Sequence, residues 1–218
     1  MVHNLGNNNS VFNEFVAEVR DEVIQKDSMR FRKNMERLGE IFAYEISKHL
    51  EYEKKEITTS LGIAEVPVLK KQPVIASILR AGLPFHLGLL NYFDKAESAF
   101  ISAYRKHKNN GTFDIRVEYV SSPDLTDKVL ILSDPMMATG ASMVKTYREL
   151  ILNGKPLHTH IVSVLASAEG IDYLHKHLSL DDITIWTGAI DDELTAQSYI
   201  VPGLGDAGDL AFGEKVQF

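Results

Sequence analysis

The residues best suited to chemistry lie between Asp134 and Ser142, directly after the apolar run at 129–133. Such a run is typical of a buried parallel strand, and a helix is predicted over 139–152. Ligands of open α/β sheets bind beyond the carboxyl ends of the strands, where the first amides of a helix favour an anion. A carboxylate at Asp134 would repel a phosphate, but it accepts hydrogen bonds from ribose hydroxyls. The segment therefore predicts a site for a phosphorylated sugar.

The turn after Asp134 combines small side chains with hydroxyl donors, in the run Ala138, Thr139, Gly140, Ala141 and Ser142. The alternative is an ordinary strand–turn–helix connection in which Thr139 caps the helix, and the local pattern leaves both interpretations open. A Walker-type P-loop is excluded because no Gly-Lys-Ser/Thr sequence follows the turn.

A second apolar run, 74–79, ends in Arg80 and a small-residue turn before a helix predicted over 84–92. A guanidinium fork beside backbone amides suits a pyrophosphate group. The alternative is an arginine whose charged end extends into solvent. Arg105 ends a further predicted strand over 98–104, and by itself it is equally well explained as a solvated loop charge.

The run from Tyr199 to Asp209 contains a G-x-G-x-x-G pattern between Gly203 and Gly208. A dinucleotide-binding fold requires a long helix after this pattern and an acid about 20 residues further on. Only ten residues follow Gly208, so that interpretation fails. Glycines do allow the main chain to lie against a flat ligand. The alternative is a glycine-rich surface turn.

These segments, in this order, resemble the motifs of the type I phosphoribosyltransferases, and specifically of the uracil phosphoribosyltransferases. The run 134–142 is similar to the family's PRPP-binding loop, the turn at Arg80 to its pyrophosphate loop, and the run 199–209 to its uracil-binding segment. The resemblance covers roughly residues 28 to 213.

Two departures within the PRPP-binding loop favour the uracil branch of this family. Many relatives have two adjacent acids there, whereas this chain has Pro135 in the second place. Purine enzymes have a further acid where this chain has Ala138.

The resemblance implies an Mg²⁺-dependent enzyme of pyrimidine salvage, which transfers ribose 5-phosphate from PRPP to N1 of uracil and releases UMP and pyrophosphate. The implied catalytic residues are Arg80, Asp134 and Asp206. The implied PRPP contacts are Arg80, Arg105, Asp134, Pro135, Met136, Met137, Ala138, Thr139, Gly140, Ala141, Ser142 and Asp206. The implied uracil contacts are Tyr199, Ile200, Gly205, Asp206 and Ala207. PRPP and water are expected to hold most of the Mg²⁺ coordination, with Asp206 as the candidate protein ligand.

Main-chain groups in a segment of this kind can match uracil, which offers two carbonyl acceptors and an N3–H donor. Cytosine has an acceptor at N3 and would leave groups unpaired, so such a site can discriminate by about 10⁴-fold. No obvious general base stands in the motif.

The elements that must position these residues alternate between strand and helix, which predicts an α/β fold with a mainly parallel sheet flanked by helices. Further strands are expected over 159–165 and 182–187, and a further helix over 169–177. Alternating residues from Phe113 to Tyr119 predict an antiparallel flap, a candidate lid that excludes water.

The chain is expected to form one phosphoribosyltransferase domain. A helical arm is assigned to 1–50, with a disordered lead at 1–10, a helix over 11–24 and a second helix capped at Asp27-Ser28. The PRPP-binding core is assigned to 70–190 and a small C-terminal uracil-binding hood to 191–218.

The composition of the chain limits the classes of partner and the cellular compartment that we expect. The net charge of −7 argues against general nucleic acid binding, and the absence of cysteine excludes disulfides and thiolate chemistry. No secretory signal and no membrane span are expected, so the predicted location is cytoplasmic. The family implies a homodimer or a larger homo-oligomer and, in some members, GTP as an effector.

Several polar clusters are predicted to lie at the surface rather than in a site. They are the pairs His158/His160 and His175/His177, and the acidic runs 181–182 and 191–193. A Ser–His–Asp hydrolase is excluded because no G-x-S-x-G sequence is present. The remaining alternatives are a transferase for another nucleobase, an RNA-binding regulator that senses PRPP or UMP, and an inactive scaffold of the same fold.

Overall fold

The apolar runs become neighbouring strands of one sheet in the computed structural model, which describes residues 1–107 and 113–215, with side chains described for 1–103 and 117–215. The strands of this sheet are β1 (Val2–Asn4), β4 (Val74–Leu79), β5 (Glu97–His107), β6 (Phe113–Ser121), β7 (Val129–Ser133), β8 (Met136–Met137), β9 (His158–Ser167) and β10 (Ile183–Asp191). Their order is β1-β10-β9-β7-β4-β5-β6, with β8 beside β9. Within the described part of this sheet only the β5–β6 pair is antiparallel, which confirms the predicted mainly parallel sheet.

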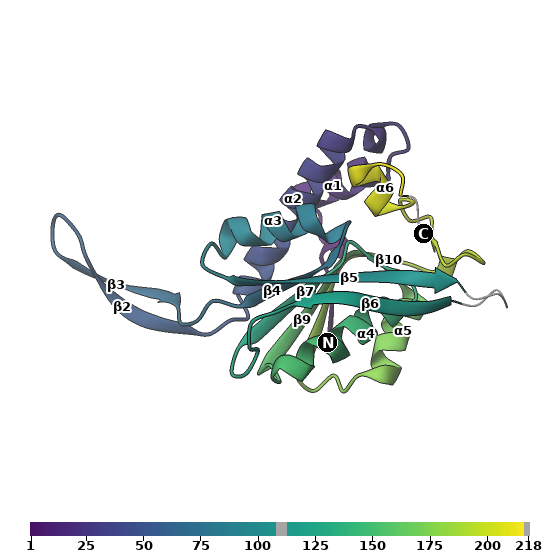
Figure 1. Cartoon of the computed structure of the whole chain (residues 1–218). Coiled ribbons are helices and arrows are strands. Elements are labelled where there is room, and N and C mark those ends of the chain that lie inside the picture. The colour runs from purple at the N-terminus through teal and green to yellow at the C-terminus, as the bar shows by residue number, and fades with distance from the viewer. Residues whose placement is uncertain (108–112, 216–218) are drawn as a thin grey trace.

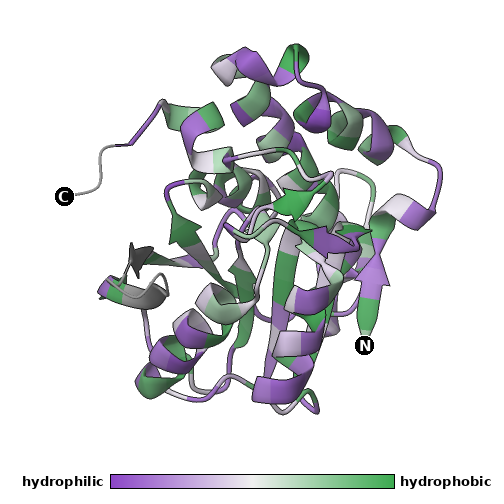
Figure 2. Cartoon of the chain, turned by 90° about the vertical axis from the view of Figure 1, so that its right-hand side faces the viewer, coloured by the Kyte–Doolittle hydropathy of each residue, from purple (hydrophilic) through white to green (hydrophobic). Residues whose placement is uncertain are grey.

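Helices cover both faces of the sheet (Figure 1). α1 (Val11–Arg20), α2 (Ser28–Ser47) and α3 (Gly82–Tyr92) lie on one face, and α4 (Ala141–Leu150) and α5 (Ala168–His177) lie on the other. The central strands β4, β7 and β9 are buried along nearly their whole length, as continuous apolar runs in parallel sheets are. Figure 2 shows these hydrophobic strands between helices of mixed hydropathy.

The first ten residues are ordered, so the predicted disordered lead is wrong. β1 pairs in parallel with β10, opposite Ile185, Trp186 and Thr187. His3 stacks on the indole of Trp186 with 4.2 Å between ring centroids. A 3₁₀ turn, η1 (Leu5–Asn7), then leads to α1. This strand depends on a partner about 180 residues away along the chain, which a local pattern does not reveal.

The first two helices are present, but α1 is shorter than predicted. It ends at Arg20 because the carboxylate of Asp21 accepts from the amides of Val23 and Ile24 and turns the chain into η2 (Ile24–Lys26). Asp27 then caps α2, accepting from the amide of Arg30 at 3.0 Å, as predicted. Rather than extending away from the core, both helices pack on it through residues such as Phe12 and Phe42.

A hairpin that the sequence patterns did not indicate projects from the body of the molecule (Figure 1). It consists of β2 (Tyr52–Thr58) and β3 (Ile63–Leu69), paired antiparallel. Every residue of β2 is exposed, and its charged side chains hide the alternation by which strands are usually found.

His160 is buried, so its predicted surface location is wrong. It is 2 % exposed, and its Nδ1 accepts a hydrogen bond from Trp186 Nε1 at 3.0 Å. Burial, together with the neighbouring His158, lowers the pKa of His160 to about 3. Neither histidine pair belongs to a cluster of three or more potential metal ligands among the described residues. None of the described helices is sufficiently long and apolar to span a membrane.

Candidate functional site

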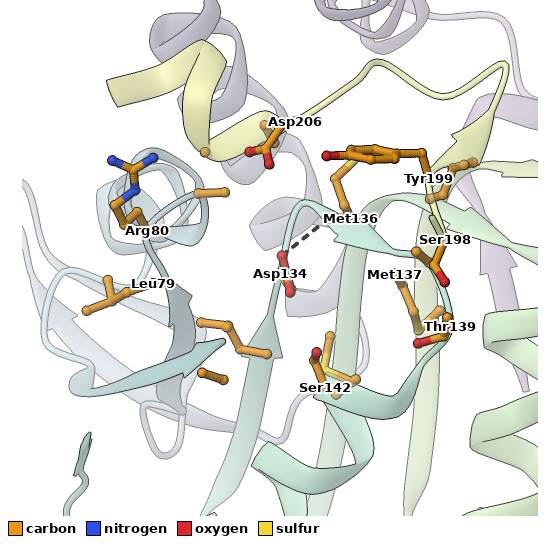
Figure 3. Close-up of a pocket in the computed structure, with 18 of the residues that line it drawn as sticks. Leu79, Arg80, Asp134, Met136, Met137, Thr139, Ser142, Ser198, Tyr199 and Asp206 are labelled. Atoms are coloured by element: carbon orange, nitrogen blue, oxygen red, sulfur yellow. Dashed lines mark hydrogen bonds between the residues drawn. The ribbon is translucent and has the colours of Figure 1, made fainter. Parts of the chain in front are cut away.

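A cavity of about 910 Å³ opens at the carboxyl ends of β4 and β7, beneath the C-terminal segment (Figure 3). Three separate parts of the chain meet there, represented by Arg80, Asp134 and Asp206. The predicted site residues that line the cavity are Arg80, Asp134, Met136, Met137, Ala138, Thr139, Gly140, Ser142, Tyr199, Ile200, Gly205, Asp206 and Ala207.

Pro135 and Ala141 are not among the residues that line the cavity. Pro135 is buried, and its carbonyl accepts from the amide of Leu165 at 3.0 Å, which fixes the loop to β9. Ala141 is the first residue of α4. The side chain of Arg105 lies outside the described side chains, and its backbone pairs with Ile115 within the β5–β6 ladder.

The loop after β7 brings Asp134 and the start of α4 to the cavity. Asp134 Oδ1 accepts from the amide of Met136 at 3.3 Å. Gly140, at φ +73°, occupies the N-cap of α4, and no side chain caps the helix there. Thr139 Oγ1 is 3.4 Å from the amide nitrogen of Ala141, outside the cap position that the alternative interpretation gave it. The first turn of α4 thus faces the cavity, with Gly140 and Ser142 in its lining.

Two residues behind this loop support it and were missed from the sequence. Ser167 donates to the carbonyl of Ala138 at 2.5 Å and accepts from the amide of Gly170 at 2.8 Å. A side chain at Gly170 could not fit, since its Cβ would lie 2.4 Å from the Ala138 carbonyl oxygen. The small residues at the β9–α5 junction are a signal that could have identified this contact.

Arg80 is held by the C-terminal segment. Its Nη2 donates to Asp209 Oδ1 at 2.9 Å and to the carbonyl of Gly213 at 3.1 Å. The side chain remains 41 % exposed, so it can exchange these partners for a ligand.

Beneath the Arg80 and Asp134 loops lies a buried chain of hydroxyl and imidazole groups. Ser77 Oγ is 2.6 Å from Ser133 Oγ and 2.9 Å from His86 Nδ1. Ser133 donates to the carbonyl of Ala76 at 3.2 Å, and His86 Nε2 is 3.1 Å from Ser98 Oγ. Burial lowers the pKa of His86 to about 4, so the ring is neutral at neutral pH. These contacts give the two loops a common support.

The C-terminal segment contributes backbone and the carboxylates of Asp206 and Glu214 to the cavity. Gly203 and Gly205 adopt φ +55° and +94°, which glycine tolerates far better than other residues. Asp206 caps the short helix α6 (Ala207–Phe212) by accepting from the amide of Asp209 at 3.0 Å, and Lys215 Nζ lies 2.6 Å from its Oδ2. Burial raises the pKa of Asp206, but the hydrogen bonds from Lys215 and from backbone amides outweigh it, so the pKa is lowered overall.

Asp191 is buried, so its predicted role as a solvated loop charge is wrong. It is 8 % exposed and forms a bidentate ion pair with Arg20, in which Nη1–Oδ2 and Nη2–Oδ1 are both 2.9 Å. Its neighbours Asp192 and Glu193 are exposed, as predicted. The partner that explains the burial lies 171 residues away along the chain.

Comparisons with known proteins agree with this geometry. The family model described as uracil phosphoribosyltransferase matches residues 7–214. A uracil phosphoribosyltransferase of Porphyromonas gingivalis is 55% identical over 215 residues, which cover 99% of each chain. One from Pyrococcus furiosus is 38% identical, covering 94% of this chain and 87% of that protein. A solved structure, the AQ2163 protein from Aquifex aeolicus, covers 100% of both chains with a TM-score of 0.87 at 28% identity. The chain belongs to the uracil phosphoribosyltransferase family.

Proposed function

We propose that this chain transfers ribose 5-phosphate from PRPP to N1 of uracil, giving UMP and pyrophosphate, and that the cavity above is its active site. The observation that carries the proposal is the meeting of Arg80, Asp134 and Gly205 around one cavity of about 910 Å³. That volume suits a ligand of nucleotide size. Family membership supports the reaction.

The sugar phosphate of PRPP is assigned to the loop after β7. The 5′-phosphate would lie at the uncapped start of α4, where amides and the hydroxyls of Thr139 and Ser142 donate to it. Asp134 would accept hydrogen bonds from the ribose hydroxyls and so fix the orientation of C1.

The pyrophosphate is assigned to the opposite side of the cavity. Arg80 would leave Asp209 and pair with the diphosphate oxygens, on which negative charge grows as the bond to C1 breaks. Arg105 is proposed to reach the same diphosphate.

The described residues suit an Mg²⁺ ion that arrives with PRPP. They offer no cluster of three or more potential metal ligands, and the carboxylates that line the cavity are Asp134, Asp206 and Glu214. Mg²⁺ would be held by PRPP and water, with Asp206 as a protein ligand after Lys215 moves away. Bound there, Mg²⁺ would neutralise charge on the leaving group.

Uracil is assigned to the C-terminal segment. Main-chain groups of Ile200, Gly205, Asp206 and Ala207 would pair with its polar edge, beside the ring of Tyr199. The positive φ at Gly205 lets the backbone face the base without a side chain in between. A base lacking the uracil pattern would leave these groups unpaired.

The wider assignments are proposals that extend the family resemblance of the sequence. We propose a cytoplasmic homodimer or larger homo-oligomer, with GTP as a candidate effector, and one domain comprising the arm (1–50), the PRPP-binding core (70–190) and the hood (191–218). The flap around β6 is proposed to exclude water during the reaction.

The direct test is incubation of the chain with PRPP, Mg²⁺ and a panel of bases comprising uracil, cytosine, orotate and hypoxanthine, followed by chromatography of the nucleotides. UMP should form from uracil, and the other bases should remain unchanged. Equal use of cytosine would contradict the assigned base contacts, and absence of UMP would contradict the proposed reaction.

A further inference from the structure

Gly203, in the proposed uracil-binding segment, is held on both sides by one ion pair. Its amide donates to Asp191 Oδ2 at 3.0 Å, and its carbonyl accepts from Arg20 Nη1 at 3.2 Å. Arg20 also donates to both carboxylate oxygens of Asp191. The three residues therefore form a ring of hydrogen bonds: Arg20 bonds to Asp191, and each of them bonds to the backbone of Gly203.

The ion pair is well placed to define a single geometry. The side chain of Asp191 is 8 % exposed and that of Arg20 is 22 % exposed, so water competes little for their hydrogen bonds. Bidentate arginine–carboxylate pairs fix orientation as well as distance. Position 203 does not accommodate a side chain, because a Cβ there would lie 2.2 Å from the carbonyl oxygen of Ile200.

Other residues of the N-terminal helices reach the same C-terminal segment. With its amide oriented to place nitrogen toward acceptors, Gln25 donates to the Leu204 carbonyl at 2.8 Å. Arg32 donates to the carbonyl of Ala211, at the end of α6, at 2.6 Å. The backbone on both sides of Gly205 is thus tied to the α1–α2 region, which does not itself line the cavity.

We propose that Arg20 and Asp191 are positioning residues for uracil: together they fix the peptide groups of Gly203 and so aim the main chain of Gly205–Ala207 at the base. This inference rests on the proposed function and assigns to α1 a part in base binding. The link is short, since Gly205 follows Gly203 by two residues and lines the cavity.

A purely structural role would be to hold α1 on the core. That task is already served by Phe12 and Val19, which are 1 % and 0 % exposed within the core. The pair instead connects the end of β10 to the loop at Gly203, so its loss should be felt first by the base subsite.

The test compares Arg20→Gln, Asp191→Asn and the double variant with the wild-type chain in steady-state kinetics. Each single change should raise KM for uracil about tenfold, the effect expected from the loss of one charged hydrogen bond. KM for PRPP and kcat should stay within about twofold, since only base binding is affected. The double variant should have a KM for uracil no higher than that of the more strongly affected single variant, because both changes remove the same interaction. Arg20→Lys, which keeps the charge and one donor, should lie between wild type and Arg20→Gln.

Glu18→Gln is the matched control, because Glu18 lies on α1 like Arg20, but its carboxylate pairs with Arg30 and Asn34 of α2 rather than with the C-terminal segment. It should leave both KM values unchanged. Hydrogen exchange supplies a readout that needs no activity: the amides of 203–207 should exchange faster in Asp191→Asn and not in Glu18→Gln.

Unchanged KM for uracil in the folded variants would overturn the inference. So would a joint rise of both KM values with a lower melting temperature, which would indicate a structural role alone. If the wild-type chain makes no UMP, the proposed function fails, whereas exchange at 203–207 still tests the link between the ion pair and the loop.

Discussion

The two halves of the cavity are built in different ways. On the phosphate side, Arg80 and Asp134 stand at the ends of neighbouring strands, and the phosphate loop is fixed by β9 and α5 directly behind it. On the base side, the segment after β12 (Ile200–Val201) has little regular structure of its own and depends on α1 and β10 for its position. The phosphate side is thus positioned by local strand-to-helix geometry, and the base side by contacts between distant parts of the chain.

The largest expected effect separates chemistry from folding on the phosphate side. Asp134→Asn should lower kcat/KM about 100-fold, because the amide is a poorer acceptor for the ribose hydroxyls and C1 is no longer held in line. The melting temperature should stay the same, since an amide oxygen can still accept from Met136. Steady-state assays with thermal denaturation measure both quantities, and wild-type activity would remove Asp134 from its role.

Arg80→Ala tests whether the two halves can be disturbed separately. KM for PRPP should rise about thirtyfold, since a charge-assisted contact to the diphosphate is lost, while KM for uracil changes much less. Arg80→Lys should be intermediate, because it keeps the charge but not the guanidinium fork. Initial rates over a grid of both substrates give the two constants. A larger effect on uracil than on PRPP would show that the halves are misassigned.

Ala207→Val is the converse change on the base side. Ala207 is 5 % exposed and lines the cavity, so added methyl groups would crowd the base. KM for uracil should rise about tenfold while KM for PRPP stays close to wild type. A competition assay among bases shows whether uracil is selectively affected, and equal loss of both substrates would contradict a separate base subsite.

The last prediction concerns the stability of the sheet beneath the cavity rather than catalysis. Burial lowers the pKa of His86 to about 4 and that of His160 to about 3, against an ordinary value of 6.5. Below pH 6.5 these two histidines are protonated in the unfolded chain but stay neutral in the folded chain until the pH falls further. The free energy of unfolding should therefore be highest above that pH. It should fall in acid by up to about 1.4 kcal/mol per pH unit for each histidine.

Urea unfolding at about pH 5 and about pH 7.5 measures this slope, with the urea dependence giving the unfolding free energy at each pH. His160→Gln should reduce the difference between the two conditions. Equal stability at both pH values would mean that these rings are protonated in the folded chain.

The same contrast explains what could be predicted from the sequence. The order of strands and helices, the Asp134 loop and the Arg80 turn were accessible because each depends on consecutive residues. The burial of Asp191 was not, since its partner Arg20 lies 171 residues away. β1 and the burial of His160 escaped for the same reason, as both depend on packing around Trp186 at the β10 strand. The β2–β3 hairpin was missed because every residue of β2 is exposed and its charged side chains interrupt the alternation of a half-buried strand.

The buried chain under the two loops also has a direction. With the hydroxyl proton of Ser133 directed to the carbonyl of Ala76, Ser77 donates its own proton to Ser133. Ser77 Oγ then accepts a hydrogen bond from His86, so the proton of the neutral imidazole lies on Nδ1. Nε2 of His86 then accepts a hydrogen bond from Ser98. In this arrangement a single tautomer orders four side chains from three strands and α3, so the strands beneath the Arg80 and Asp134 loops share one sequence of donors and acceptors.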